Sequence, residues 1–561
     1  MTALQACCSV RFIQLQLTGW ADIFFGNYTG TTVINNVRLA LIALSIVLIV
    51  TSFWFFARFT VDDAFITWRY GRNLVDFGIW NYNPSLTDLT QAYTNPIYAL
   101  LSIIPAYFKI DVVLFFKLFS VTMLVAFFTY FYSKTKSLLM TLMAYAVPAT
   151  FIHAFSGLET FLFVTLLVAL FISMDEDKPV SSVVFTIMLI LTRPEAWLLS
   201  LMVPLFFLIR HQVGGYRDVK ELLLSPKKLF LISAYKKIYK KPLVILMILV
   251  VIMAAYFTIH KMLFGFALPN TFYIKAGNHF SLKLLIFTII TVTPLLLLQQ
   301  SKRLALIVLF SGFFVIVGFQ YTTSSLQMNY AERFWFHILM PIYFILVYVA
   351  SKNDSIIPIV SDKLQRLNLT LNTSQYINTV AFGLLFLMTI TTVLGNPSHR
   401  VSDYPRALDS HTEFGKTLNT LKADNKVDSF SFGDAGMASY HSQLNALDTI
   451  GLGSALLAHN GLNESLLDLY SPTIVAFYAR PDEIRIAEYN QKVIKKWTDQ
   501  KGYIYVCDIY MYPSYTFKIY AVKSYPEIIK VCGSSKAKND IENGEYLRRI
   551  LTKSPFSYWH G

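Results

Sequence analysis

The chain has 561 residues, of which 55% are hydrophobic and only 15% are charged. An ordinary soluble domain carries about 25% charged residues, so these numbers exclude one and indicate a polytopic helical membrane protein. The net charge of +14 does not imply nucleic acid, because half of it comes from the loop 210–242, where nine basic residues face two acidic ones between apolar runs.

The first segment, 1–37, is too mixed in character for a cleaved signal peptide and is predicted to be cytoplasmic. From 38 to 395, apolar runs follow one another that can cross a hydrocarbon core of about 30 Å. The positive-inside rule places the loop 210–242 in the cytoplasm, beside anionic lipid headgroups. Counting outward predicts about eleven spans, at 39–57, 112–132, 138–154, 158–173, 181–192, 195–209, 243–264, 283–299, 303–320, 334–350 and 377–395.

Two parts of this membrane region are irregular. The apolar segment 96–108 is short for a span, and counting it would invert every later loop, so we expect an amphipathic helix at the outer surface. Arg193-Pro194 should break the helix between the fifth and sixth spans. With this topology the loops that are rich in charged and polar residues all lie on the outer side of the membrane. The most important of them is the first external loop, 60–111.

Asp62 and Asp63 stand side by side at the start of the loop 60–111. Two carboxylates at the exit of a membrane helix carry a large desolvation cost unless they bind or catalyse something. A carboxylate can take the proton of an attacking hydroxyl, and two adjacent ones can share a cation or one can have a raised pKa. The structural alternative is an ion pair with Arg69 or Arg72.

Further polar groups are set in the other external turns. Arg193-Pro194-Glu195 is a charged tripeptide in an apolar region, suited to gripping a phosphate or to pairing internally. Glu159 lies at the lip of a span and also suits a helix N-terminus. Lys275 and Arg333 could neutralise a lipid phosphate or mark the membrane interface.

After Gly395 the composition becomes that of a globular domain. In 396–561, β-rich runs such as SFSFGDAG, TIVAFYA, YIYVCDIYMY and YTFKIYAV alternate with helical runs such as EIRIAEYNQKVIKKWTDQ, which predicts an extracytoplasmic soluble α/β domain. Cys507 and Cys532 could form a disulfide there. The four cysteines show no metal spacing, and an adjacent acid pair is compatible with a divalent cation without requiring one, so no cofactor is certain.

Five ordered motifs, DDAFITWRYGRNL, TQAYTNPIYALL, SGLET, LTRPEA and LPNTFYIKAG, resemble those of the AftB-like arabinofuranosyltransferases, a family of GT-C membrane glycosyltransferases that depend on polyprenyl-phosphate donors. The stretch DAG…NALDTIGLG near Asp434 is similar to the start of that family's external domain. The resemblance implies a GT-C fold, an all-α polytopic membrane protein of about 11 transmembrane helices with a C-terminal extracytoplasmic α/β domain.

The resemblance also implies an activity. An inverting transferase would move a single sugar, arabinofuranose as the best match, from a polyprenyl-phosphate donor to an extracytoplasmic glycan or protein acceptor. The enzyme would lie in the inner (plasma) membrane, with its active site on the periplasmic side. The catalytic residues would be Asp62 and Asp63. The donor phosphate or sugar would be bound by Arg69, Arg72, Asn73, Tyr93, Thr94, Asn95, Glu159, Arg193, Glu195, Asn270, Tyr273, Lys275 and Arg333.

Two other functions remain open at this stage. A transporter or flippase for lipid-linked glycans would use the outer polar groups for binding only, but paired broken helices in two corresponding halves are not evident. An oligosaccharide ligase or polymerase would be expected to carry its active loop late in the chain rather than after the first span.

Overall fold

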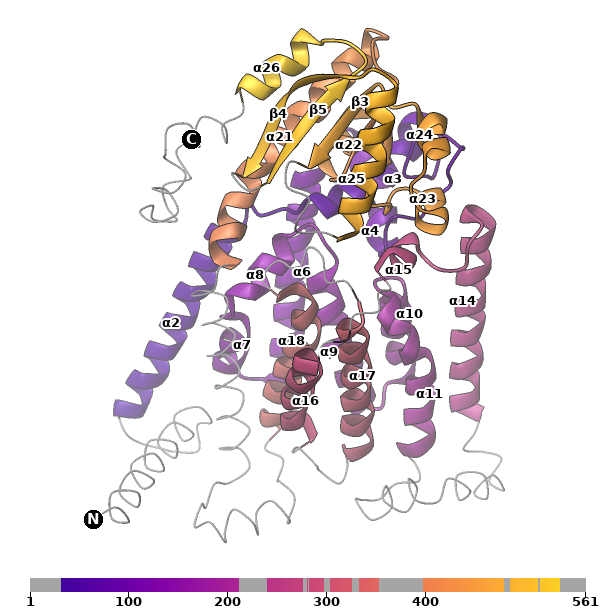
Figure 1. Ribbon diagram of the computed structural model, residues 1–561. Helices are drawn as coiled ribbons and strands as arrows, with labels where there is room; N and C mark the ends of the chain where they lie inside the picture. Colours follow the sequence, from indigo (N-terminus) through magenta and orange to yellow (C-terminus); the bar gives the residue numbers. More distant parts are fainter. Residues whose placement is uncertain are drawn as a thin grey trace, which may run out of the picture.

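The computed structural model describes residues 32–210, 240–275, 280, 282–296, 303–324, 332–352, 397–478, 485–512 and 515–534. The apolar helices form a bundle, and a small sheet with its own helices lies beyond one end of it (Figure 1). The helices of the bundle are α2 (Thr32–Phe56), α6 (Val112–Thr135), α7 (Leu138–Tyr145), α8 (Pro148–Phe155), α9 (Thr160–Asp175), α10 (Pro179–Ile190), α11 (Leu199–Arg210), α14 (Lys240–Phe264), α16 (Leu282–Leu296), α17 (Leu304–Thr322) and α18 (Arg333–Ala350).

Within the described ranges, five helices are long and apolar enough to cross a membrane. Length and composition therefore make this a multi-pass membrane protein. The shorter apolar helices α9, α10 and α16 coincide with predicted spans, and their crossing stays a prediction. The predicted span 377–395 lies outside the described residues. The five qualifying segments are Leu39–Phe56, Val112–Thr135, Pro242–Phe264, Leu304–Thr322 and Arg333–Ala350.

The predicted span 138–154 is broken in the structure, and its crossing stays a prediction. It consists of α7 and α8, which meet at an angle of 62°. Pro148 is the first residue of α8, and proline cannot continue a preceding helix because it lacks the amide proton and its ring clashes with the turn before it. The expected break at Arg193-Pro194 is confirmed, because α10 ends at Ile190 and a 3-10 turn, η1 (Pro194–Leu198), precedes α11.

The centre of the bundle is formed by α9 and α18. Nearly every residue of both helices is buried, as expected for helices that are apolar on all sides. The loop 60–111, predicted to be external and called the external loop below, contains α3 (Asp62–Phe77), α4 (Pro96–Leu101) and α5 (Ile103–Phe108). The segment predicted as one interfacial helix is thus two short ones, with exposed apolar side chains at Leu100, Tyr107 and Phe108.

The C-terminal region folds as the predicted α/β unit around a five-stranded sheet of order β2-β1-β3-β5-β4. The strands β1, β2 and β3 are parallel, whereas β5 is antiparallel to both β3 and β4. All four predicted strand runs are strands, and β2 was missed because it is only NALD. The elements are α21 (Pro397–Ala423), β1 (Ser429–Phe432), α22 (Met437–Ser442), β2 (Asn445–Asp448), α23 (Ala455–Asn460), α24 (Glu464–Tyr470), β3 (Ile474–Tyr478), α25 (Arg485–Gln500), β4 (Ile504–Tyr512), β5 (Tyr515–Ala521) and α26 (Pro526–Ser534).

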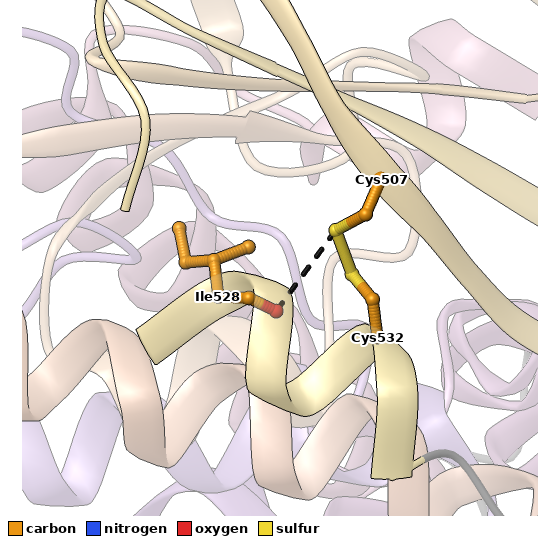
Figure 2. Close-up of a disulfide and its surroundings, with 3 residues drawn as sticks. All are labelled: Cys507, Ile528 and Cys532. Carbon is orange, nitrogen blue, oxygen red and sulfur yellow. Dashed lines mark hydrogen bonds between the residues drawn. A yellow bond between two sulfur atoms is a disulfide. The ribbon is translucent and has the colours of Figure 1, made fainter. Parts of the chain in front are cut away.

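Cys507 and Cys532 form a disulfide that links β4 to α26 (Figure 2). The Sγ of Cys507 also lies 3.9 Å from the carbonyl oxygen of Ile528, which is in α26 as well. Because the bond closes a loop of 25 residues, it is expected to stabilise this region by about 3 kcal/mol through the unfolded chain.

The external loop and the C-terminal region are joined by a dense set of hydrogen bonds. The carboxylate of Asp88 accepts bonds from the Ser454 hydroxyl, the Tyr470 hydroxyl and the backbone amide of Ala455. Asn83 exchanges two bonds with the backbone of Ala446 at the free edge of β2. Because buried polar groups are costly to leave unpaired, these bonds hold the C-terminal region against the loop.

Candidate functional site

A cavity of about 260 Å³ opens where the external loop, the adjoining ends of the bundle helices and the C-terminal region meet. Its walls come from segments far apart in the sequence, and Leu452 is the contribution of the C-terminal region. The predicted site residues among those that line it are Asp63, Tyr93, Thr94, Asn95, Glu159, Arg193, Glu195, Lys275 and Arg333. The turns that carry the motifs therefore converge on one space.

Asp63 is placed in this cavity by the first turn of α3. Its side chain is 18% exposed and lies 4.0 Å from Nη1 of Arg333. Among the residues that the structure describes, no group donates a hydrogen bond to Asp63. Its carboxylate is thus held near a cation while remaining open to a proton from a ligand.

The other two acids of the cavity are already paired with Arg193. Nη1 of Arg193 donates to Oε1 of Glu159 at 2.6 Å, and its Nη2 and Nε donate to the two oxygens of Glu195 at 2.7 and 3.1 Å. Asn95 holds the second oxygen of Glu159, and the hydroxyl of Tyr321 donates to Glu195. Both oxygens of both acids are thus engaged, and three of the five N–H groups of Arg193 are used within this cluster. Its charge is therefore already balanced before a phosphate could bind.

Lys275 and Arg333 are less fully paired than Arg193, and Arg333 has the 4.0 Å contact with Asp63 described above. Within the described residues, the Lys275 ammonium makes no hydrogen bond or ion pair, and Nε of Arg333 is buried without a partner. Burial lowers the pKa of Lys275, against the attraction of Asp63, and the nearby charge of Arg333 lowers it further. An anionic ligand would relieve this repulsion, so the pair is suited to a phosphate.

Asp62 lies outside the cavity, although it precedes Asp63 directly. Its two carboxylate oxygens accept hydrogen bonds from the backbone amides of Gly436 and Met437, at 2.9 and 2.7 Å. A Cβ on Gly436 would lie 2.0 Å from the carbonyl oxygen of Asp62, so only glycine permits this approach. Burial and the charge of Asp434 raise the pKa of Asp62 to about 7, opposed by His411. Asp62 therefore contacts the C-terminal region rather than the cavity, and the catalytic role expected from the sequence stays a prediction.

Five predicted donor-binding residues also lie outside the cavity lining, and their part in donor binding stays a prediction. Arg69 and Asn73 bind carbonyl oxygens of the external loop, and Arg69 also binds that of Leu444. Arg72 donates to Asp76 and to the carbonyl of Tyr440. These side chains satisfy backbone groups that the folded loop would otherwise bury unpaired.

The remaining two residues face the C-terminal region. Asn270 donates to the carbonyl oxygens of Gly451, Leu452 and Ser454. The ring of Tyr273 packs 4.3 Å from that of His459. Both side chains therefore fasten the turn that carries Lys275, and they influence the site through it.

Sequence reasoning missed the polar residues that the end of α17 and the two residues just after it add to the cavity, namely Gln320, Tyr321, Thr323 and Ser324. Tyr321 is the most informative, because its hydroxyl connects Glu195 to Nδ1 of His337. A cluster of polar residues directly after an apolar run was the available signal. Among the described residues, no group of three or more His, Cys, Asp or Glu is arranged to hold a metal ion.

No family model and no curated protein matches the chain. Among solved structures, the chain is similar to the Archaeoglobus fulgidus oligosaccharyltransferase tethered with an acceptor peptide that contains the NVT sequon. The identity is 10%, the match covers 86% of this chain and 74% of that chain, and the TM-score is 0.41. The activity of this chain is therefore argued from its own residues.

Proposed function

We propose that this chain is an inverting GT-C glycosyltransferase that moves one sugar from a polyprenyl-phosphate carrier to an extracytoplasmic acceptor. The proposal rests on three side chains that line the same cavity. Asp63 could accept a proton from a ligand, and the cations Lys275 and Arg333 could bind a phosphate. These are the groups that glycosyl transfer from a lipid phosphate requires.

In this reaction an acceptor hydroxyl attacks the anomeric carbon from the face opposite the phosphate. The bond between that carbon and the phosphate oxygen breaks as the new glycosidic bond forms, and Asp63 takes the hydroxyl proton. The charge that develops on the departing polyprenyl phosphate is balanced by Lys275 and Arg333. The rigid Arg193 cluster would orient the sugar.

The cavity size supports a small donor group. A space of about 260 Å³ can accommodate a single sugar and its phosphate. The motif resemblance makes arabinofuranose the leading sugar. A glycan or protein acceptor would approach from the C-terminal region, which contributes Leu452 to the wall.

The same proposal includes a location. The site and the C-terminal region would face the periplasmic side of the inner membrane. The disulfide between Cys507 and Cys532 supports this side, because such bonds persist in oxidising compartments.

The experiment is to incubate the purified full-length chain with a panel of polyprenyl-phosphate sugars and to measure release of the free carrier phosphate. We expect release with one donor, strongest for arabinofuranose, and none with the Asp63→Asn variant. Donor binding without release from any member of the panel would overturn the transferase and favour the transporter.

A further inference from the structure

Lys117, a lysine of the bundle, does not line the cavity. It connects the segment that leads to Asp63 with the segment that leads to Glu159. Lys117 lies in the second turn of α6, inside a candidate span. Its Nζ donates hydrogen bonds to the carbonyl oxygens of Phe59 and Phe155, the latter at 2.6 Å. In the portion of the chain that the structure describes, no carboxylate pairs with this ammonium.

The two acceptors occupy equivalent positions in their segments. Phe59 precedes Asp63 by four residues, and Phe155 precedes Glu159 by four. Phe59 follows the end of α2, and Phe155 is the last residue of α8. Lys117 therefore links two backbone segments. One leads to Asp63, and the other leads to Glu159 of the Arg193 cluster.

Two further contacts bring the same segments together. The backbone amide of Val61 donates to the carbonyl oxygen of Ser156 at 2.9 Å. Gly157, at φ +81°, lies so close to α3 that a Cβ would be 2.9 Å from both Ala64 and Trp68. Hence the separation of the segments is defined closely, and Lys117 is the side chain that bridges them.

We propose that Lys117 is a positioning residue for the transfer reaction, holding Asp63 at its working distance from Glu159 and Arg193. A charged side chain inside a span is costly unless it serves a purpose. An ammonium offers three donors at one point and no acceptor, so a single lysine can tie two backbone carbonyls where an apolar residue ties none.

This inference rests on the proposed function, and its test uses steady-state kinetics of the full-length enzyme with its best donor. The variant is Lys117→Met, which keeps the length of the side chain and removes the donors. Displacing a catalytic group by about 1 Å costs about 100-fold in rate, so we expect kcat to fall by about 10- to 100-fold. The donor KM should stay unchanged, because Lys275 and Arg333 are untouched.

The matched control is Lys134→Met, the same substitution at the opposite end of α6, where the lysine pairs with Glu176. It should keep a wild-type kcat. The proposal is overturned if folded Lys117→Met has a wild-type kcat, if its donor KM rises as much as its kcat falls, or if Lys134→Met loses as much. Absence of carrier release by the wild-type chain would instead overturn the proposed function.

If Lys117→Met does not fold, Lys117→Arg decides the question, because it keeps the charge and the donors on a longer, planar group. A folded Lys117→Arg protein with reduced kcat and unchanged donor KM supports positioning. A wild-type kcat in Lys117→Arg, with Lys117→Met unfolded, would show that the lysine serves folding alone and would overturn the proposal.

Discussion

Asp62 and Asp63 are neighbours in the chain, yet the carboxylate of Asp62 is bound by the backbone of Gly436 and Met437, whereas that of Asp63 lines the cavity beside Arg333. Both lie in the first turn of α3, where successive side chains point about 100° apart. Adjacent positions therefore contact different parts of the protein, and under the proposed function Asp62 would hold the C-terminal region while Asp63 would act as the base.

Substitution of each acid by its amide should separate these tasks. Asp63→Asn should fold normally and lose at least about 100-fold in transfer, the contribution of a positioned base. Asp62→Asn should lose about 1.5–3 kcal/mol of stability, because one of two charge-assisted bonds is replaced by a clash between donors. Carrier release and thermal unfolding measure the two effects. Wild-type transfer by Asp63→Asn would remove the base assignment.

Stability should decrease as the pH rises from about 4 to about 8. The pKa of Asp62 is raised from 3.8 to about 7, so the folded state retains a proton that the unfolded chain releases over this interval. Burial lowers the pKa of His411, but its hydrogen bond with Asp434 and the charges of Asp434 and Asp62 raise it overall. The stability due to this imidazolium is likewise lost as the pH rises through its folded pKa.

Unfolding temperatures measured across this pH range in detergent, at constant ionic strength, test the expectation. The Asp62→Asn protein should show a flatter profile, because the contribution of Asp62 is removed while that of His411 remains. A wild-type stability that increases over the interval, or identical slopes for the two proteins, would be inconsistent with this account.

The two open cations should govern donor affinity. Lys275→Met and Arg333→Gln are each expected to raise the donor KM about 10-fold or more, since a hydrogen bond to a charged group is worth about 1.5–3 kcal/mol. The comparison is Lys178→Met, which removes an exposed lysine that pairs with Glu176. Unchanged donor KM values in both cavity variants would exclude this phosphate site.

Arg193 should matter for stability more than for donor binding. Arg193→Gln leaves Glu159 and Glu195 buried without their cation, which costs about 3–5 kcal/mol. Arg193→Lys keeps the charge but loses the bidentate geometry, so its loss should be smaller. Thermal unfolding and donor KM are measured together. A large rise in KM in Arg193→Lys at an unchanged unfolding temperature would return Arg193 to the donor site.

The sequence alone determined the membrane character of the chain, the division into a bundle and a C-terminal α/β region, and the motifs that carry the site. These features depend on local patterns, such as apolar runs, prolines and alternating strands, which act over a few turns of chain. For the same reason the sequence could identify charged residues next to apolar helices as candidate site residues. These are Asp63, Glu159, Glu195, Lys275 and Arg333.

Only the tertiary structure decided which of these groups remain open to a ligand. Arg193 lines the cavity, where two carboxylates already pair with its guanidinium. Asp62 is held outside the cavity by amides 374 and 375 residues away, and Arg69 by a carbonyl 375 residues away. Partners so distant leave no local pattern, because they are chosen by how the C-terminal region docks on the loop. The same docking leaves Lys275, Arg333 and Asp63 in the lining of the cavity.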